Sequence, residues 1–268
     1  MELKPFIKWA GGKRQLLSQL LHHVPSEYNR YIEPFLGGGA MFLAVQPKQA
    51  IVSDINPEII NAFKVIKTDH KGLMKKLNRM KNNEDYFYKV RKQKPADLSD
   101  TDRAARFIYL NKTCFNGLYR ENSKGEFNVP FAHHENPSFF DENNMIDLHA
   151  YLNTSEVEFL CDDYKDILAK AQKGDFIYLD SPYYPLKKNS FTKYFKSDFS
   201  EKDHKELAAL FRELDKKGCY VLMSNSNTKF VKDLYKDFKI IEIEARRSIN
   251  SKGTGRQKDK IEVFIKNY

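Results

Sequence analysis

The sequence predicts an α/β protein that is built on a mostly parallel sheet and carries an inserted helical segment. Short apolar runs alternate with helical patterns from Tyr31 to about Lys67 and return from Val157 to Met223, which is typical of strand–helix–strand units. Residues 69–141 between them are charged, rich in lysine and mainly helical in pattern, which predicts the insertion. The length of 268 residues suits one α/β domain with such an insertion.

The first half of the predicted sheet begins with a short strand at Tyr31–Phe35, followed by a glycine-rich turn and an apolar helix start. Residues 50–53 form a second short strand that ends at Asp54. Pro57 suits the first turn of a helix that continues to about Lys67, because the first N–H groups of a helix have no partner within it. This order of elements predicts parallel pairing of the strands.

The second half of the predicted sheet follows the insertion and ends in an antiparallel pair. Ser200 caps a helix that stops at Gly218, since serine suits the position before a helix and glycine the position after it. The last two strands alternate apolar and polar residues and flank a basic loop, so we expect them to pair antiparallel at the end of the sheet. The predicted strands of this half are residues 157–161, 176–179, 220–223, 238–244 and 260–266.

Charge is unevenly distributed along the chain, whose formal net charge is +9. Residues 61–130 hold 16 lysines and arginines against 8 aspartates and glutamates, which accounts for most of the excess. Such a segment can attract phosphates, although a solvated helical surface has the same composition. The three cysteines lie far apart, so they predict no zinc site and fit a reducing cytoplasm. No apolar run approaches the ~20 residues of a membrane span, and the N-terminus does not resemble a secretory signal.

A glycine-rich turn after the first predicted strand indicates a ligand with an adenosine-like part. Gly37–Gly39 follow Phe35 and let the backbone approach a ligand closely. Phe42 stands where the dinucleotide fingerprint has its third glycine, which disfavours a nicotinamide oxidoreductase. Asp54, at the end of the next strand, can accept hydrogen bonds from ribose hydroxyls. A tight turn and a helix-capping aspartate are the structural alternative.

The run Asp180-Ser181-Pro182-Tyr183 directly follows a predicted buried strand, where α/β sheets bind ligands. It suits methylation of an aromatic amine, whose lone pair is delocalised and needs hydrogen-bond acceptors to localise it. Asp180 supplies one acceptor and the carbonyl of Ser181 a second, while Tyr183 can stack on a base extruded from the helix. The hydroxyl and N–H of Ser181 can also bond to Asp180 and compete with the amine. A strand-terminating turn with a surface tyrosine is the alternative.

These motifs, in this order, resemble the Dam and DpnII/MboI type of adenine-N6 DNA methyltransferases, the α-group. The resemblance covers nearly the whole chain and is carried by the runs KPFIKWAGGKRQLL, YIEPFLGGGA, SDIN, NKTCFNGLYR, GEFNVPF, GDFIYLDSPY and SNS. It implies a doubly wound, Rossmann-like methyltransferase sheet with an antiparallel last strand, formed by residues 1–68 and 142–268. Residues 69–141 would then be the target-recognition module. The implied methyl donor is S-adenosylmethionine, the implied substrate is double-stranded DNA containing GATC, and no metal is expected.

The resemblance also implies roles for single residues. The cofactor contacts would be Trp9, Lys13, Phe35, Gly37, Gly39, Asp54, Asp163, Tyr164 and Asp180. The catalytic motif would be Asp180, Ser181, Pro182 and Tyr183. The DNA contacts would be Lys8, Phe115, Asn116, Leu118, Arg120 and Asn128.

The chemistry of the side chains independently supports three of these expected DNA contacts. Arginine is the usual partner of guanine O6 and N7 in the major groove, which suits Arg120, although a phosphate contact or a surface ion pair is the alternative. Phe115 and Leu118 are apolar residues in a basic loop and can act as a wedge beside the extruded base. Core packing is the alternative for Phe115 and for Trp9.

The chain departs from the family at one catalytic position, because the family has Asp-Pro-Pro-Tyr where this chain has Ser181. One alternative is therefore that the chain is a DNA-binding relative of the family without catalytic activity. A second alternative is an RNA adenine methyltransferase on the same fold, although such enzymes often begin the motif with asparagine, where this chain has Asp180. The sequence does not decide whether a cognate restriction endonuclease is a partner.

Overall fold

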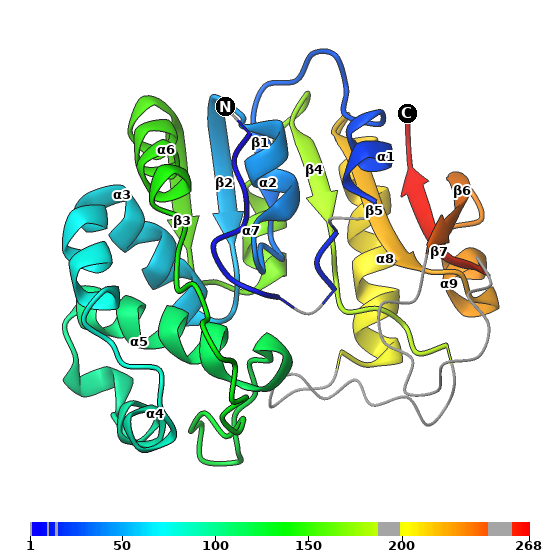
Figure 1. Cartoon of the computed structure of the whole chain (residues 1–268). Coiled ribbons are helices and arrows are strands. Elements are labelled where there is room, and N and C mark those ends of the chain that lie inside the picture. Colours follow the sequence, from blue (N-terminus) through cyan, green and yellow to red (C-terminus); the bar gives the residue numbers. More distant parts are fainter. Residues whose placement is uncertain (1, 10, 14–15, 187–198, 246–258) are drawn as a thin grey trace.

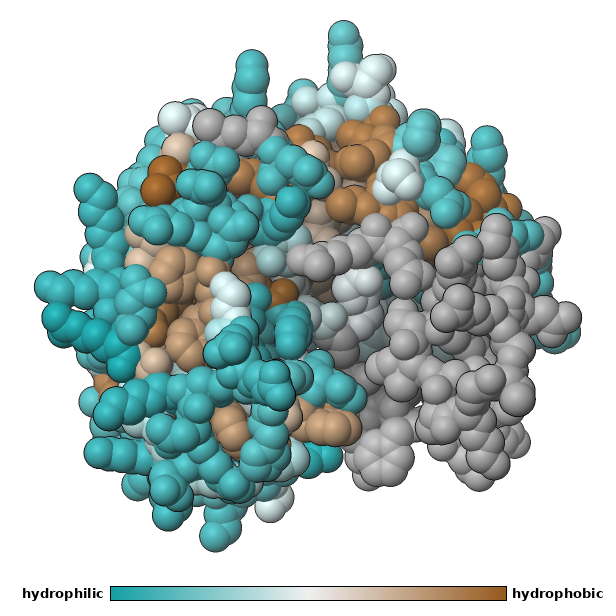
Figure 2. Space-filling model, viewed as in Figure 1, coloured by the Kyte–Doolittle hydropathy of each residue, from teal (hydrophilic) through white to brown (hydrophobic). Residues whose placement is uncertain are grey.

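The computed structural model describes residues 2–9, 11–13, 16–186, 199–245 and 259–268. The described residues form a seven-stranded sheet with helices on both of its faces (Figure 1). The helices of the inserted segment lie beside the β3 edge of this sheet, and the β6–β7 pair forms the opposite edge. In the view of Figure 2 the side chains over the inserted segment, at the lower left, are mostly hydrophilic.

The strand order is β3-β2-β1-β4-β5-β7-β6. The first five strands in this order pair parallel, and β7 is inserted antiparallel between β5 and β6. The chain winds outward from β1 in both directions, so the order reverses between β1 and β4, and ligands of open α/β sheets bind at such a point. The strands are β1 (Tyr31–Glu33), β2 (Gln49–Ser53), β3 (Glu156–Leu160), β4 (Phe176–Leu179), β5 (Tyr220–Ser226), β6 (Lys239–Ala245) and β7 (Asp259–Lys266).

Two hydrophobic cores cover the two faces of the sheet, because successive residues of a strand point to opposite faces. In β4, Phe176 and Tyr178 enter the first core, whereas Ile177 and Leu179 enter the second. The first core includes residues of helices α1 to α6, and the second includes residues of α7, α8 and α9. The helices are α1 (Leu17–Leu21), α2 (Ala40–Val45), α3 (Pro57–Leu77), α4 (Glu84–Arg91), α5 (Asp100–Thr113), α6 (Glu142–Thr154), α7 (Tyr164–Ala169), α8 (Glu201–Lys216) and α9 (Lys229–Leu234), with 3₁₀ turns η1 (Pro95–Asp97) and η2 (Phe115–Gly117).

The doubly wound sheet with its antiparallel last strand confirms the predicted fold class. The cap of α8 is also confirmed, because Ser200 accepts from the N–H of Asp203 and Asp203 accepts in return from the N–H of Ser200. Gly218 follows this helix with φ of +80°, which favours glycine. The predicted basic loop between β6 and β7 lies mostly outside the described residues.

Three boundaries differ from the expected ones by two residues or more. β1 ends at Glu33 and not at residue 35, since Pro34 has no N–H to donate to a ladder. β5 continues to Ser226 because β7 pairs with it along that length. α3 continues to Leu77, although its backbone breaks at Asp69 (φ −144°), whose carboxylate accepts from the N–H of Gly72 and so restarts the helix.

Within the described ranges, no helix combines the length and the apolar composition that a membrane span requires.

Candidate active site

The predicted site residues gather where three neighbouring strands end. Phe35 and the glycine turn follow β1, Asp54 follows β2 and Asp180 follows β4. These strands are adjacent and parallel, in the order β2-β1-β4, so their carboxyl ends share one edge of the sheet. The two acids therefore lie on either side of the glycine turn, and the glycine turn and Asp180 flank the point where the strand order reverses.

Asp54 is held by two backbone donors. Its Oδ2 accepts from the N–H of Gly37 over 2.8 Å, and its Oδ1 accepts from the N–H of Asn56 over 2.9 Å. Burial raises the pKa of Asp54 to about 6, while the two N–H donors pull it down. Each carboxylate oxygen can accept a further hydrogen bond, so Asp54 can still bind ligand hydroxyls.

Trp9 packs against the glycine turn. This agrees with the expectation that Trp9, Gly37 and Gly39 belong to the same site. Gly37 has φ of +50°, and a Cβ at this position would lie 2.7 Å from Cδ1 of Trp9. Gly39 has φ of +70°, and a Cβ there would lie 2.9 Å from Cζ of Phe63. Both glycines are thus required by backbone conformation and by close packing. The half-buried Trp9 ring also contacts the ring of Tyr119, with 5.9 Å between centroids, so core packing accounts for part of its role.

Phe35 and the segment after β3 form the next part of the site. The rings of Phe35 and Tyr164 stack with their centroids 5.2 Å apart. Asp163 begins α7 and accepts from the N–H of Lys165. The carbonyl of Asp162 accepts from the hydroxyl of Ser53, which joins this segment to the end of β2, one residue before Asp54. The structure therefore brings Asp163 and Tyr164 to the same side of the site as Asp54.

Asp180 has an ion pair and a hydrogen bond on the same oxygen. Nζ of Lys13 lies 2.9 Å from its Oδ1, and the hydroxyl of Ser224 donates to that Oδ1 over 2.9 Å. Lys13 is 6% exposed and also donates to the carbonyl of Gly11. For the other oxygen, Oδ2, no hydrogen bond or ion pair is found among the described residues. Asp180 is thus oriented through Oδ1 and can accept a hydrogen bond from a ligand at Oδ2.

The rest of the catalytic motif shows one departure from expectation. Nζ of Lys13 lies 4.5 Å from the ring centroid of Tyr183, and Pro182 is exposed. Ser181 is 2% exposed, and its hydroxyl has no hydrogen-bond partner among the described residues. The expectation that this hydroxyl bonds to Asp180 is therefore wrong, whereas the same expectation for the N–H of Ser181 stays a prediction.

The predicted DNA-contacting residues form a second group, on a hairpin-like loop. Backbone bridges join Cys114 to Phe131 and Glu121 to Phe127. Nε of Arg120 donates to Oδ1 of Asn128 over 2.7 Å, so these two side chains lie together. Phe115 is 53% exposed, which excludes core packing for it, whereas Leu118 is half-buried against the first core.

Lys8 is joined to this loop by a buried asparagine. The carboxamide of Asn111 accepts from the N–H of Lys8 and donates to the carbonyls of Lys8 and Gly117, over 2.7–2.9 Å. A Cβ at Gly117 would lie 2.5 Å from Cδ of Lys8, and Asn116 before it has φ of +56°. Lys8 and Trp9 are neighbours, so one short segment contacts both the hairpin-like loop and the glycine turn.

Sequence reasoning missed Ser224 and Ile55. Ser224 belongs to the quoted run SNS, but its role depends on the neighbouring strand, since its hydroxyl also meets that of Tyr178 at 3.1 Å. Ile55 directly follows Asp54 and is 60% exposed, which offers an apolar surface at the site. The sequence signal for Ile55 was an apolar residue directly after the acid that ends a strand.

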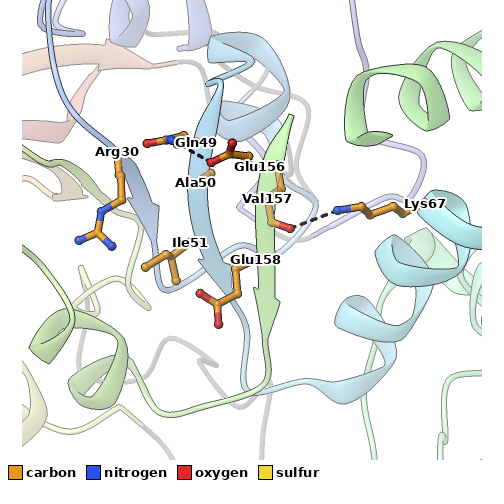
Figure 3. Close-up of a pocket in the computed structure, with 8 residues that line it drawn as sticks. All are labelled: Arg30, Gln49, Ala50, Ile51, Lys67, Glu156, Val157 and Glu158. Carbon is orange, nitrogen blue, oxygen red and sulfur yellow. Dashed lines mark hydrogen bonds between the residues drawn. The ribbon is translucent and has the colours of Figure 1, made fainter. Parts of the chain in front are cut away.

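A pocket on the described surface lies apart from this site (Figure 3). It lies over the amino-terminal parts of β1, β2 and β3, where Nε2 of Gln49 donates to Glu156 and Nζ of Lys67 donates to the carbonyl of Val157. Asp54 and Asp180 follow the opposite ends of their strands, so this pocket is not part of the candidate active site. Among the described residues, no group of histidine, cysteine, aspartate and glutamate is arranged to hold a metal ion.

Comparisons with known proteins identify the family of this site. The sequence model of the D12 class N6 adenine-specific DNA methyltransferases matches residues 9–249. The Type II methyltransferase M.MjaIII of Methanocaldococcus jannaschii is 42% identical, with 100% of both chains covered. The Type II methyltransferase M1.LlaDCHI of Lactococcus lactis subsp. cremoris is 38% identical over 100% of this chain and 96% of its own. A DNA adenine methylase of Serratia marcescens is 36% identical over 95% of each chain. The chain therefore belongs to the D12 class of N6 adenine-specific DNA methyltransferases.

Proposed function

We propose that this chain transfers the methyl group of S-adenosylmethionine to N6 of an adenine in double-stranded DNA, at the sequence GATC. The observation that carries the proposal is the arrangement of Asp180, whose Oδ1 is held by Lys13 and Ser224 and whose Oδ2 can accept from an amine. Family membership supports the reaction, and the named DNA adenine methylases among the relatives support the substrate.

The residues of the site fit S-adenosylmethionine. Asp54 offers the ribose hydroxyls a carboxylate, and the exposed Ile55 beside it offers an apolar surface for an adenine ring. Two buried polar atoms nearby, the amide nitrogen of Asn56 and the hydroxyl of Tyr164, have no hydrogen-bond partner in the described part of the chain. Lys13 and Asp180 provide opposite charges for the carboxylate and ammonium of the methionine part. When bound, the cofactor supplies an electrophilic methyl group.

The chain itself orients the amine and takes its proton. We assign Oδ2 of Asp180 and the carbonyl of Ser181 as the two acceptors that localise the N6 lone pair. Methyl transfer would form the bond from N6 to the methyl carbon as the bond from that carbon to the sulfonium sulfur breaks and leaves a thioether, and the proton that the amine gives up would go to Oδ2 of Asp180. Tyr183 provides the aromatic surface on which the extruded adenine stacks.

We further propose that residues 69–141 form the target-recognition module and the remaining residues the catalytic domain. The excess of basic residues in this part of the chain supports DNA binding, because phosphate contacts supply most of the affinity of such proteins. The exposed Phe115 suits a wedge beside the extruded base, and Lys8, Asn116, Leu118, Arg120 and Asn128 complete the contact surface. We also propose a cytoplasmic location and a cognate restriction endonuclease as a partner, and the relatives named Type II methyltransferases support the second of these.

One experiment tests the proposal against its alternatives. Transfer of labelled methyl groups from S-adenosylmethionine is measured to a GATC duplex, to a duplex of scrambled sequence and to RNA. Transfer to the GATC duplex alone is expected. Transfer to RNA would favour an RNA adenine methyltransferase, and binding without transfer would favour a silenced relative marked by Ser181.

Arg120→Ala is expected to relax discrimination at one guanine of the site. An arginine that bonds to O6 and N7 of guanine contributes ~1–3 kcal/mol of discrimination, which is lost when the base or the side chain changes. Dissociation constants for duplexes substituted at each position measure this loss, with Lys124→Ala, an exposed lysine of the same loop, as the control. An equal fall in affinity for all sequences would make Arg120 a phosphate contact.

Ser181→Pro is expected to raise the single-turnover rate roughly two- to fivefold. The ring of proline restricts the backbone of the motif, which contributes ~0.4–1 kcal/mol at compatible sites. The substitution also removes a buried hydroxyl that has no partner among the described residues. Single-turnover methylation of a GATC duplex at saturating cofactor compares the two proteins. If the serine protein has no activity and the proline variant is fully active, the chain is a silenced relative.

A further inference from the structure

The hydroxyl of Tyr183 is bound by an acid from the far end of the chain. Tyr183 donates to Oε2 of Glu262 over 2.7 Å, although the two residues are 79 positions apart. Burial and the negative charges of Asp180 and Glu262 raise the pKa of Tyr183 well above its usual range, so the phenol keeps its proton. Burial also raises the pKa of Glu262, while the nearby Lys13 and the hydrogen bond from Tyr183 lower it. In this hydrogen bond the phenol of Tyr183 is the donor and Oε2 of Glu262 is the acceptor.

Glu262 stands on an inner strand of the sheet. It lies in β7, opposite Ser226 of β5 and Ile243 of β6. Glu262 forms the last pair of the β5–β7 ladder, and the register of the β6–β7 ladder shifts directly after its pair with Ile243. Its backbone is thus paired on both sides, whereas Tyr183 lies in an irregular segment after β4. A side chain on a paired strand positions a loop residue better than another loop residue would.

Lys13 holds the same tyrosine at a second point. Its Nζ lies 4.5 Å from the ring centroid of Tyr183 and 2.9 Å from Oδ1 of Asp180. The ring is thus fixed at its hydroxyl by Glu262 and approached on one face by an ammonium group that also pairs with Asp180. Loss of the hydroxyl contact would free the ring to turn while the ion pair of Asp180 remained.

We propose that Glu262 is a positioning residue that holds the ring of Tyr183 in the orientation in which it stacks on the target adenine. This inference rests on the proposed function, because it requires an extruded base that meets the ring. Glu262 acts only through the hydroxyl of Tyr183 and contacts neither the base nor the methyl donor. A ring that is already oriented loses less freedom when the base arrives, and small misplacements of reacting groups are costly in rate.

Two variants of Glu262 separate the hydrogen bond from the charge. Glu262→Asp keeps the charge but shortens the side chain by one methylene, so it withdraws the acceptor from the 2.7 Å contact. Glu262→Gln loses the charge but keeps the length and an acceptor oxygen. Single-turnover methylation of a GATC duplex at saturating cofactor is expected to slow about tenfold for Glu262→Asp and at most about threefold for Glu262→Gln.

A double-mutant cycle with Tyr183→Phe tests whether Glu262 acts through the hydroxyl. In the Tyr183→Phe protein, Glu262→Asp is expected to change the rate less than about twofold, because the bond is already absent. Fluorescence of 2-aminopurine at the target position reports whether stacking of the base changes in parallel. The control is Glu242→Asp on β6, an acid that pairs with Lys232 and is expected to leave the rate within about twofold of the parent.

The outcomes separate this inference from the proposed function. A parent protein that methylates no duplex overturns the proposed function. A parent that methylates GATC overturns the positioning role if Glu262→Asp matches it. The role also fails if Glu262→Gln is the slower variant, or if Glu262→Asp is equally slow with and without the hydroxyl.

Discussion

Asp180→Ala is expected to lower the single-turnover rate of methyl transfer by at least about 10²-fold. A positioned group that accepts a proton contributes roughly 10²–10⁴-fold to a rate, and no other side chain of the motif carries a carboxylate that could take the proton of the amine. The substitution also removes the counter-ion of Lys13, which is 6% exposed, and a buried charge without a partner is unfavourable. The measurement is methylation of a GATC duplex at saturating cofactor, with circular dichroism to confirm the fold.

Two further variants make this result specific. Ser224→Ala removes one hydrogen bond to Oδ1 of Asp180 but leaves the ion pair with Lys13, so a smaller loss of about tenfold is expected. Asp233→Ala removes an exposed acid of α9 that pairs with Lys229 and is expected to leave the rate unchanged. If Asp180→Ala kept more than a few per cent of the parental rate, Asp180 would not be the acceptor.

Asp54→Ala is expected to weaken the binding of S-adenosylmethionine by ~1.5–3 kcal/mol. This corresponds to a dissociation constant roughly 10- to 150-fold higher. The reason is the loss of hydrogen bonds from the ribose hydroxyls to a charged acceptor that Gly37 and Asn56 hold in place. Isothermal titration calorimetry measures the constant directly. An unchanged affinity would place Asp54 outside the cofactor site.

The pH dependence of this affinity provides an independent check. Burial raises the pKa of Asp54 to about 6, and the cofactor binds the ionised carboxylate. Protonation removes acceptor capacity, so the affinity of the parent is expected to fall as the pH is lowered through about 6 and to lose this dependence above it. Asp54→Asn has no carboxylate to titrate near pH 6, so its weaker affinity for the cofactor is expected not to fall as the pH is lowered through this range. A parallel fall in both proteins would assign the titration to another group.

Local sequence was sufficient for most elements and for the positions of the chemical motifs. The run at 176–179 predicted β4 without error, because four buried apolar residues and a following acid describe a central parallel strand. Ser200 and Gly218 marked the ends of α8, since capping and left-handed backbone depend on residues a few positions away. The placement of Asp54 and Asp180 at strand ends followed from the same local patterns.

Contacts between distant parts of the chain were decided only by the tertiary structure. Lys13 meets Asp180, and Tyr183 meets Glu262, because the N-terminal segment and an inserted antiparallel strand converge on the end of β4. The hydropathy pattern predicts that a strand is buried, but it does not specify which strand lies beside it. The sequence by itself determined the kind of fold, the chemical groups and the edge of the sheet where they act. Only the folded chain decided which group holds which, because a side-chain contact depends on the path of the whole backbone and not on its neighbours in sequence.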